Sequence, residues 1–156
     1  MHDPETEARL RPLVEVVTHL PHYRALGLEV VDYAPGRATL RCDYRPELVG
    51  DPLTGVVHGG VVTTILDSVC GLACFLGLDE PQAIATLDLR IDYLRPARVE
   101  RPIFGFAELH RQTRSVAFLR GHAYQDDMDD AVATCVATFM IGSVGFNPGG
   151  DGGVQP

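Results

Sequence analysis

The chain has 156 residues, of which 46% are hydrophobic and 22% charged, and its formal net charge is −8 at pH 7. This length predicts one domain with a single core. The acidic charge disfavours nucleic acid as a partner, and no uninterrupted apolar run reaches the ~18 residues of a membrane span. The first five residues lack the basic start and apolar stretch of a signal peptide, so we expect a cytoplasmic protein.

A helix is predicted over residues 4–19, because hydrophobic residues recur there at helical spacing along one face. Asp3 is the expected N-cap and Pro4 suits the first helical position. We expect Pro21 to end this helix.

A hairpin is predicted next, with strands at 27–34 and 37–44 joined by a Pro-Gly turn. Residues 46–57 contain two prolines and two glycines, so they are expected to form a loop.

A second helix is predicted over residues 61–78, and its circumference is mostly apolar, which favours a buried position. Asp67 is the only charged residue between His58 and Asp79. It lies on a stripe of small or weakly polar residues that would let a ligand or a partner subunit approach closely. That stripe consists of Gly60, Thr63, Thr64, Asp67, Cys70, Gly71 and Cys74.

Four strands are predicted in the second half of the chain, at 82–95, 100–111, 114–126 and 130–142. In the first of them, apolar residues from Ala83 to Tyr93 alternate with polar ones, so Leu87 is expected on the buried face and Thr86 on the opposite face. Thr86 would reach a site only through a β-bulge or at a dimer edge. The last strand is apolar on both faces, which is typical of a central strand or of a strand at an interface.

Antiparallel strands around one apolar helix, without βαβ alternation, indicate an α+β fold. We expect one domain over residues 1–142, with its N-terminal helix within 1–20. Residues 143–156 are rich in glycine and proline and are expected to be a disordered tail.

The cysteines and histidines do not form a metal-binding pattern. The four cysteines show no CxxC pair, and although Cys70 and Cys74 lie one helical turn apart, free apolar thiols are the expected role. No three histidines share a ligand spacing, so no metal is predicted. Ser68 adjoins Asp67 on the helix, and no GxSxG elbow is present, which excludes a Ser-His-Asp triad.

The glycine pair Gly59-Gly60 opens the second helix, where unpaired amide N–H groups and the positive end of the helix dipole can polarise a carbonyl. Asp67 can act as a base or nucleophile, or it can be a structural carboxylate bonded to Thr63, Thr64 or Ser68. The pair and the carboxylate are about 10 Å apart along one helix. We therefore expect Asp67 of one chain to face the glycine pair of a second chain.

The sequence resembles a known family in two segments. The first is His58-Gly59-Gly60 with Asp67 nine residues after the histidine, and the second is residues 86–97, which read TLDLRIDYLRPA. Over residues 20–142 the chain is similar to the PaaI-like acyl-CoA thioesterases of the hotdog fold. The resemblance implies an antiparallel sheet of five to six strands wrapped around one long central helix. It also implies a homodimer with active sites across the interface, often paired into a homotetramer.

The resemblance assigns roles to particular residues. It implies that Asp67 is the general base or nucleophile and that Gly59 supplies the oxyanion N–H. His58 would have a positioning role, and Thr86 would assist the attacking water. The residues implied at the substrate are Gly60, Ser68, Arg95, Arg98, Arg114 and Ser115, the arginines and Ser115 at the nucleotide end of coenzyme A. Coenzyme A would be part of the substrate, and no separate cofactor is implied.

The expected activity is hydrolysis of an acyl- or aryl-CoA thioester to the free acid and coenzyme A. An alternative is a non-catalytic acyl-CoA or lipid-binding protein on the same fold. It is favoured by Pro52, which stands where family members usually carry an asparagine, six residues before the histidine. A hydratase acting on enoyl thioesters would need a histidine paired with the acid in another motif, which the sequence lacks.

Overall fold

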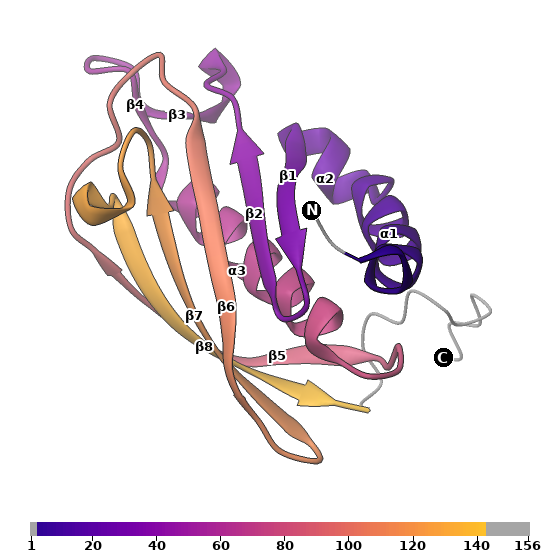
Figure 1. Cartoon of the computed structure of the whole chain (residues 1–156). Coiled ribbons are helices and arrows are strands. Elements are labelled where there is room, and N and C mark those ends of the chain that lie inside the picture. The colour runs from indigo at the N-terminus through magenta and orange to yellow at the C-terminus, as the bar shows by residue number, and fades with distance from the viewer. Residues whose placement is uncertain (1–2, 143–156) are drawn as a thin grey trace, which may run out of the picture.

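The computed structural model describes residues 3–142, and the chain begins there with two helices at one side of a sheet (Figure 1). Helix α1 (Pro4–Thr18) confirms the predicted N-terminal helix, and the Asp3 carboxylate accepts hydrogen bonds from the Glu5 and Thr6 N–H groups at its start. The first helix ends before Pro21, as predicted, but a second short helix that was not predicted follows it. Pro21 begins α2 (Pro21–Leu26), because the ring of proline suits the first helical turn.

The main sheet has six antiparallel strands in the order β1-β2-β6-β7-β8-β5. The strands are β1 (Leu28–Ala34), β2 (Arg37–Cys42), β5 (Ile84–Tyr93), β6 (Ile103–Gln112), β7 (Val116–Tyr124) and β8 (Ala133–Ile141). All four strands predicted in the second half are present, and β8 is an interior strand paired with β5 on one side and β7 on the other.

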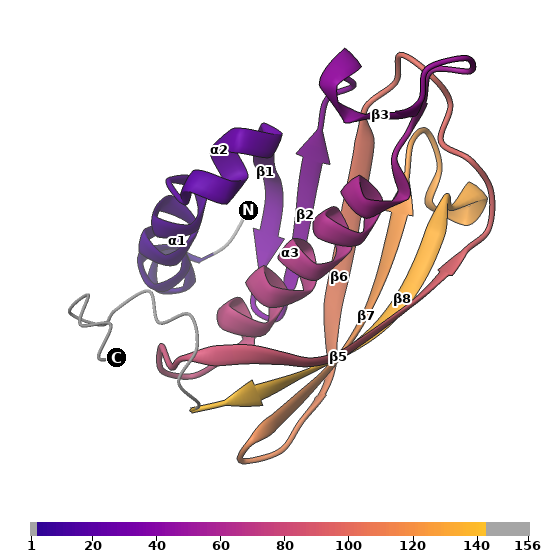
Figure 2. The same ribbon diagram turned by 180° about the vertical axis from the view of Figure 1, so that it is seen from behind.

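Helix α3 (Gly59–Gly77) lies in the concave face of this sheet, as Figure 2 shows from behind. Its buried face is fully apolar, and Ile65, Leu66 and Val69 have no exposed surface. Although α3 is long and apolar enough to cross a membrane, more than half of it is buried inside the fold, as in the core helix of a soluble protein. The predicted α+β architecture, a sheet wrapped around one long helix, is confirmed.

The sheet does not close around α3. Its edge strands are β1 and β5, and α1 and α2 lie beside α3 and β1 in the space between these edges (Figure 2). Residues 3–142 share one hydrophobic core, to which Leu10 and Val17 of α1 contribute. The predicted tail at 143–156 lies outside the described residues.

Residues 46–57, which were predicted to form a loop, also contain regular structure. They contain a 3-10 turn (Pro46–Leu48) and the two-stranded hairpin of β3 (Val49–Asp51) and β4 (Val56–Val57). The Asp51 side chain accepts hydrogen bonds from the Leu53 N–H and the Thr54 hydroxyl, which closes the turn. A side chain that bonds its own turn supplies a local structure that hydrophobic periodicity does not reveal.

Strand β5 departs from the regular alternation that its sequence predicts. Its register to β8 shifts between Thr86 and Asp88, so Leu87 is the extra residue of a β-bulge and is 51% exposed. A bulge moves the residues before it to the other face. The predicted burial of Leu87 is therefore wrong, and Thr86 faces α3 instead of lying on the opposite face.

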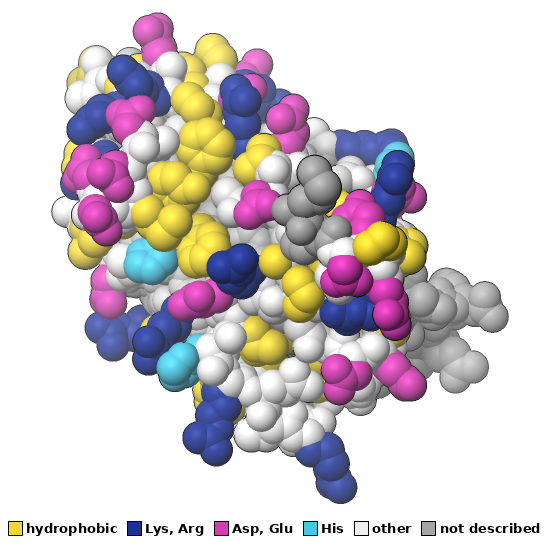
Figure 3. Space-filling view, viewed as in Figure 1, with side chains coloured by type: hydrophobic (Ala, Val, Ile, Leu, Met, Phe, Trp, Pro, Cys, Tyr) yellow, Lys and Arg dark blue, Asp and Glu magenta, His cyan; other side chains and the backbone are white. Residues whose placement is uncertain are grey.

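The outer face of the sheet is partly apolar. Figure 3 shows hydrophobic side chains gathered there among charged ones. On β6 and β7 the rings of Phe104 and Tyr124 stack with centroids 5.5 Å apart, and those of Phe106 and His122 with centroids 6.5 Å apart. No helix of residues 3–142 covers this face in either view.

Candidate active site

The start of α3 presents one amide without an acceptor. The first four N–H groups of a helix have no partner within the helix. Here the His58 N–H donates to the Leu48 carbonyl, the Gly60 N–H to Nδ1 of His58, and the Val61 N–H to the His58 carbonyl. Within residues 3–142 nothing accepts from the Gly59 N–H. The Gly59 N–H is therefore the one amide of this first turn that has no acceptor among the described residues.

His58 is the N-cap of α3, and this sets its tautomer. Because Nδ1 accepts the Gly60 N–H at 2.9 Å, the proton of the neutral ring is on Nε2. The backbone of His58 is held from the other side by Gly50 of β3, where a Cβ atom would lie 2.7 Å from the His58 Cα. The hairpin of β3 and β4 thus fixes the position of the cap.

Asp67 lies two turns into α3 and is half-buried. Its Oδ1 accepts a hydrogen bond from the Thr86 hydroxyl at 3.0 Å. The bulge at Leu87 makes this contact, because it turns Thr86 of the edge strand toward the helix. The partners considered from the sequence, Thr63, Thr64 and Ser68, form no hydrogen bond to Asp67. The hydroxyls of the two threonines donate instead to the carbonyls of Gly59 and Gly60.

Tyr93 is a site residue that the sequence reasoning missed. Its hydroxyl donates to the Gly59 carbonyl at 2.9 Å and lies 2.7 Å from the Thr63 hydroxyl. Tyr93, the last residue of β5, thereby holds the first turn of α3 in place. The available signal was the segment 86–97, in which Tyr93 was interpreted only as an apolar strand residue.

A cavity of about 170 Å³ opens beside Asp67 and Thr86. Its other walls are apolar and come from α1, α2, α3, β5 and β8; we call it the Asp67 cavity. Tyr23 of α2 lies in its wall and donates a hydrogen bond to the Ser68 carbonyl at 3.2 Å. Burial raises the pKa of Tyr23 well above its ordinary value, so the phenol stays protonated and remains a donor. The lining residues are Val17, Leu20, Tyr23, Asp67, Ser68, Gly71, Leu72, Phe75, Ile84, Thr86 and Phe139.

The free Gly59 amide and the Asp67 carboxylate of α3 lie far apart within one chain. Gly59 and Asp67 are eight residues apart, which is about 12 Å along the helix axis. Gly59 is next to Tyr93 at the end of β5, whereas Asp67 is next to Thr86 near its beginning. A single thioester carbonyl cannot reach both within one chain.

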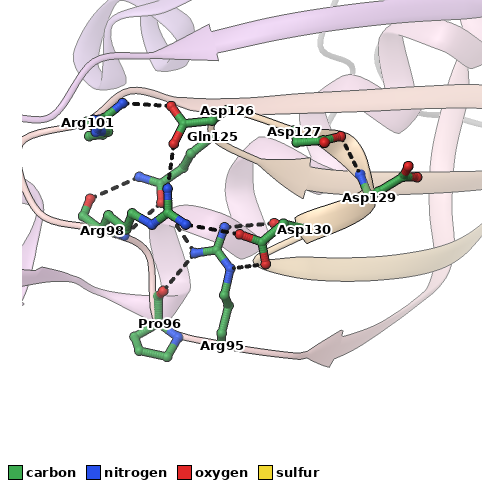
Figure 4. Close-up of polar contacts among 9 residues, drawn as sticks. All are labelled: Arg95, Pro96, Arg98, Arg101, Gln125, Asp126, Asp127, Asp129 and Asp130. Atoms are coloured by element: carbon green, nitrogen blue, oxygen red, sulfur yellow. Dashed lines mark hydrogen bonds and ion pairs between the residues drawn. The ribbon is translucent and has the colours of Figure 1, made fainter.

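The arginines after β5 are engaged in a network with acidic residues (Figure 4). Arg95 pairs with Asp130 at 2.9 Å, and Arg98 pairs with Asp126 at 2.6 Å and with Asp130 at 3.2 Å. Arg101 also pairs with Asp126, at 2.7 Å. This cluster joins the segment after β5 to the turn between β7 and β8.

Arg114 and Ser115 lie at the opposite end of the sheet, in the turn between β6 and β7. The ten residues of β5 separate the two ends, which is about 30 Å at ~3.3 Å per residue. Within one chain, the structure does not bring Arg114 and Ser115 together with Arg95 and Arg98. Gly60 lines a second cavity at the α3 N-terminus, and Pro52 is exposed in the turn after β3.

The cysteines of residues 3–142 are buried free thiols, as predicted. The sulfur atoms of Cys70 and Cys135 are 3.7 Å apart, and burial raises the pKa of Cys74 to about 12. No group of three metal-ligating side chains is present among the described residues.

Comparison with known proteins identifies the family. The model of the thioesterase superfamily matches residues 54–132, which include the whole of α3 and β5. The chain belongs to the thioesterase superfamily. A medium/long-chain acyl-CoA thioesterase, YigI of Salmonella typhimurium, is 34% identical over 139 residues, which cover 81% of this chain and 88% of YigI.

Solved structures of similar proteins have the same fold. A Pseudomonas aeruginosa protein is 41% identical with a TM-score of 0.75, and the match covers 84% of this chain and 97% of that one. The phenylacetic acid degradation protein PaaI of Thermus thermophilus, solved as a mutant, is 28% identical with a TM-score of 0.68 over 78% of this chain and 98% of PaaI. The chain is thus a thioester hydrolase of the PaaI-like hotdog type, as its sequence predicted.

Proposed function

We propose that this thioesterase hydrolyses an acyl-CoA to the free acid and coenzyme A, with Asp67 as the base. The observation that carries the proposal is the half-buried Asp67 carboxylate, which is held by Thr86 at the polar end of an apolar cavity. The activity named for YigI supports acyl-CoA as the substrate. A cytoplasmic location is consistent with the free cysteines.

In the proposed reaction, Asp67 removes a proton from a water molecule, which Thr86 helps to position. The hydroxide adds to the thioester carbonyl carbon, and the Gly59 N–H donates to the carbonyl oxygen as it becomes negative. One such donor contributes typically ~3 kcal/mol in a site without water. The carbon–sulfur bond then breaks, and the thiolate of coenzyme A takes the proton back from Asp67. Direct attack by Asp67 is distinguished by a single turnover in labelled water, which would leave label in its carboxylate.

We propose that a second copy of the chain completes the site. Strand β5 is ten residues long, and its outer edge has no partner within residues 3–142. An unpaired edge of this length favours pairing with another strand. Antiparallel pairing of two β5 strands about a two-fold axis sets Thr86 of one chain opposite Tyr93 of the other. Asp67 then faces Gly59 of the second copy, whose N–H has no acceptor in its own chain.

The same arrangement explains two distant groups of substrate residues. The two-fold axis brings the turn with Arg114 and Ser115 of one chain toward the Arg95 and Arg98 segment of its partner. We propose that these residues contact the phosphates of coenzyme A, in competition with Asp126 and Asp130. The unit is a homodimer, and the partly apolar outer sheet face is available for pairing two dimers into a homotetramer.

The remaining residues proposed at the substrate lie at the start of α3 and in the Asp67 cavity. Gly60 and His58 shape the start of α3, and Ser68 lines the Asp67 cavity. The competing candidate is a binding protein without turnover. Pro52 favours it, because the proline has no side-chain amide to hold a carbonyl or a water.

The test is thiol release from straight-chain and aromatic acyl-CoAs by the wild-type chain and Asp67→Asn. The thioesterase proposal expects turnover of at least one substrate and a loss of about 10²-fold or more in the variant, the size of a general-base contribution. Asp79→Asn is the matched control, because Asp79 is an exposed carboxylate just after α3. Acyl-CoA binding without any turnover would overturn the proposal and support the binding protein.

A further inference from the structure

We infer that the N-terminal helices limit the length of the acyl chain. The Asp67 cavity, to whose wall these helices contribute Val17, Leu20 and Tyr23, accepts an unbranched acyl group of medium length. This inference rests on the proposed function, since it assigns the acyl part of the same substrate. The family match begins at residue 54, so α1 and α2 lie outside it.

The shape of the cavity suits a hydrocarbon chain that starts at the reacting carbonyl. Its polar side chains gather at one end, where Thr86, which is exposed, donates to Asp67. The Tyr23 hydroxyl donates to the carbonyl of the neighbouring Ser68 at the same end. From Asp67 the apolar wall continues along α3 to Phe75, eight residues or about 12 Å further on. An elongated apolar space with its polar group at one end fits a linear acyl chain better than a round group.

The volume limits the length of that chain. An engineered apolar cavity of about 150 Å³ in another protein binds benzene, a six-carbon molecule. The Asp67 cavity, at about 170 Å³, therefore holds about six carbon atoms. Together with the carbonyl carbon, this gives a chain between hexanoyl and octanoyl as the best substrate.

The wall that α1 and α2 contribute is firm because the N-terminal segment is anchored. Val17 is 3% exposed and belongs to the hydrophobic core. Tyr23 is fixed to α3 by its hydrogen bond to the Ser68 carbonyl. Leu20 sits at the corner between α1 and α2 and is only half-buried, so its side chain can be shortened with little disturbance of the core.

Gly71 provides independent support. It lies within α3, where glycine is unfavourable compared with alanine. An added Cβ atom would lie 3.7 Å from the ring of Phe139, an ordinary contact distance, so packing alone does not require glycine. The missing methyl group instead leaves space in the wall of the cavity, one turn from Asp67.

The experiment measures kcat/KM for acyl-CoAs from butanoyl to hexadecanoyl with the wild-type chain, Leu20→Ala and Gly71→Ala. For the wild-type chain we expect a rise of about four-fold per methylene up to hexanoyl or octanoyl, the factor that corresponds to ~0.8 kcal/mol per buried methylene. Leu20→Ala removes three carbon atoms and should move the optimum about two carbons longer. Gly71→Ala should move it shorter while the melting temperature stays the same or rises.

Val16→Ala is the matched control, since Val16 is on the same helix as Val17 but 40% exposed and outside the cavity. Its length profile should equal that of the wild-type chain. A wild-type optimum at hexadecanoyl, or profiles of Leu20→Ala and Gly71→Ala that overlay the wild type, would overturn the inference. A higher rate with phenylacetyl-CoA than with any linear chain would also overturn it.

A wild-type chain that hydrolyses none of these thioesters would overturn the proposed function alone. The cavity is then tested with S-alkyl-CoA thioethers of the same lengths, which bind but cannot be hydrolysed. The inference is supported if the alkyl length with the lowest Kd becomes longer in Leu20→Ala and shorter in Gly71→Ala. A Kd that does not depend on chain length would overturn it.

Discussion

Gly59→Pro removes the proposed oxyanion donor and no other hydrogen bond. Proline has no N–H, and within residues 3–142 nothing accepts from the Gly59 N–H. Gly59 is also the first residue of α3, the position where proline is favoured in helices. His58, with φ −61° and ψ 135°, already has the extended conformation that a following proline requires.

The expected effects on activity and on stability therefore differ. Loss of one oxyanion donor lowers kcat by about 10²- to 10³-fold. The free energy of unfolding should stay the same or increase by about 0.4–1 kcal/mol, because proline restricts the unfolded chain. Few substitutions at a reactive position separate activity from stability so clearly.

The assay combines kcat and KM for the best acyl-CoA with thermal unfolding. Gly59→Ala is the matched control: it keeps the N–H, and its Cβ atom would contact the Tyr93 ring at 3.7 Å, an ordinary distance. A folded Gly59→Pro variant with kcat within three-fold of Gly59→Ala would refute the assignment of this amide. Mixing Gly59→Pro with Asp67→Asn should restore part of the activity, because a mixed dimer contains one intact site. No recovery in dimers shown to exchange subunits would refute the shared site.

Three further predictions concern the supports of the site. Tyr93→Phe should lower kcat more than it raises KM, because it removes the hydrogen bond to the Gly59 carbonyl. It should also lower the melting temperature by about 1–4 °C, the effect of losing one hydrogen bond in a domain of this length. Tyr33→Phe, which removes a hydroxyl bonded to Glu7, is the control and should change only the melting temperature. His58→Ala should cost about 1 kcal/mol as a lost N-cap, measured by denaturant unfolding, and His58→Asn should recover most of it, since asparagine is a preferred cap. The hydrogen bond from Thr54 lowers the pKa of Asp51 below its ordinary value of 3.8. The ionised Asp51 carboxylate therefore stabilises the folded state above pH 3.8, and this stabilisation is lost as the pH falls through the lower pKa of the folded state. Asp51→Asn should therefore have a lower free energy of unfolding than the wild-type chain at pH 7, and the difference should shrink as the pH falls below 3.8. A difference that does not depend on pH would contradict this cause.

Much of the candidate site could be predicted from short segments. The helix start at Gly59 and the apolar circumference of α3 are visible as a glycine pair followed by a helical pattern. Residues within one or two turns of each other decide such features. The acid at position 67 was visible for the same reason, as the only charge in a long apolar run.

The sequence did not reveal which residues support these groups. Regular alternation placed Thr86 on the wrong face, because a bulge depends on how β5 pairs with β8 and not on its own residues. Tyr93 lies 34 residues from Gly59, and their hydrogen bond requires β5 to run alongside α3. The arginines after β5 were visible as charges, but their pairing with Asp126 and Asp130 depends on the turn after β7.

The sequence by itself determined the elements of this protein: one long apolar helix opened by two glycines, a helix before it, and strands on either side. Local propensity and hydrophobic period are properties of neighbouring residues, so they can be read along the chain. Only the tertiary structure decided that Thr86 holds Asp67, that Tyr93 holds Gly59, and that the N-terminal helices close a cavity beside the carboxylate. These contacts join residues far apart in sequence, and they exist because the curved sheet wraps around α3 and leaves its edge strand beside it.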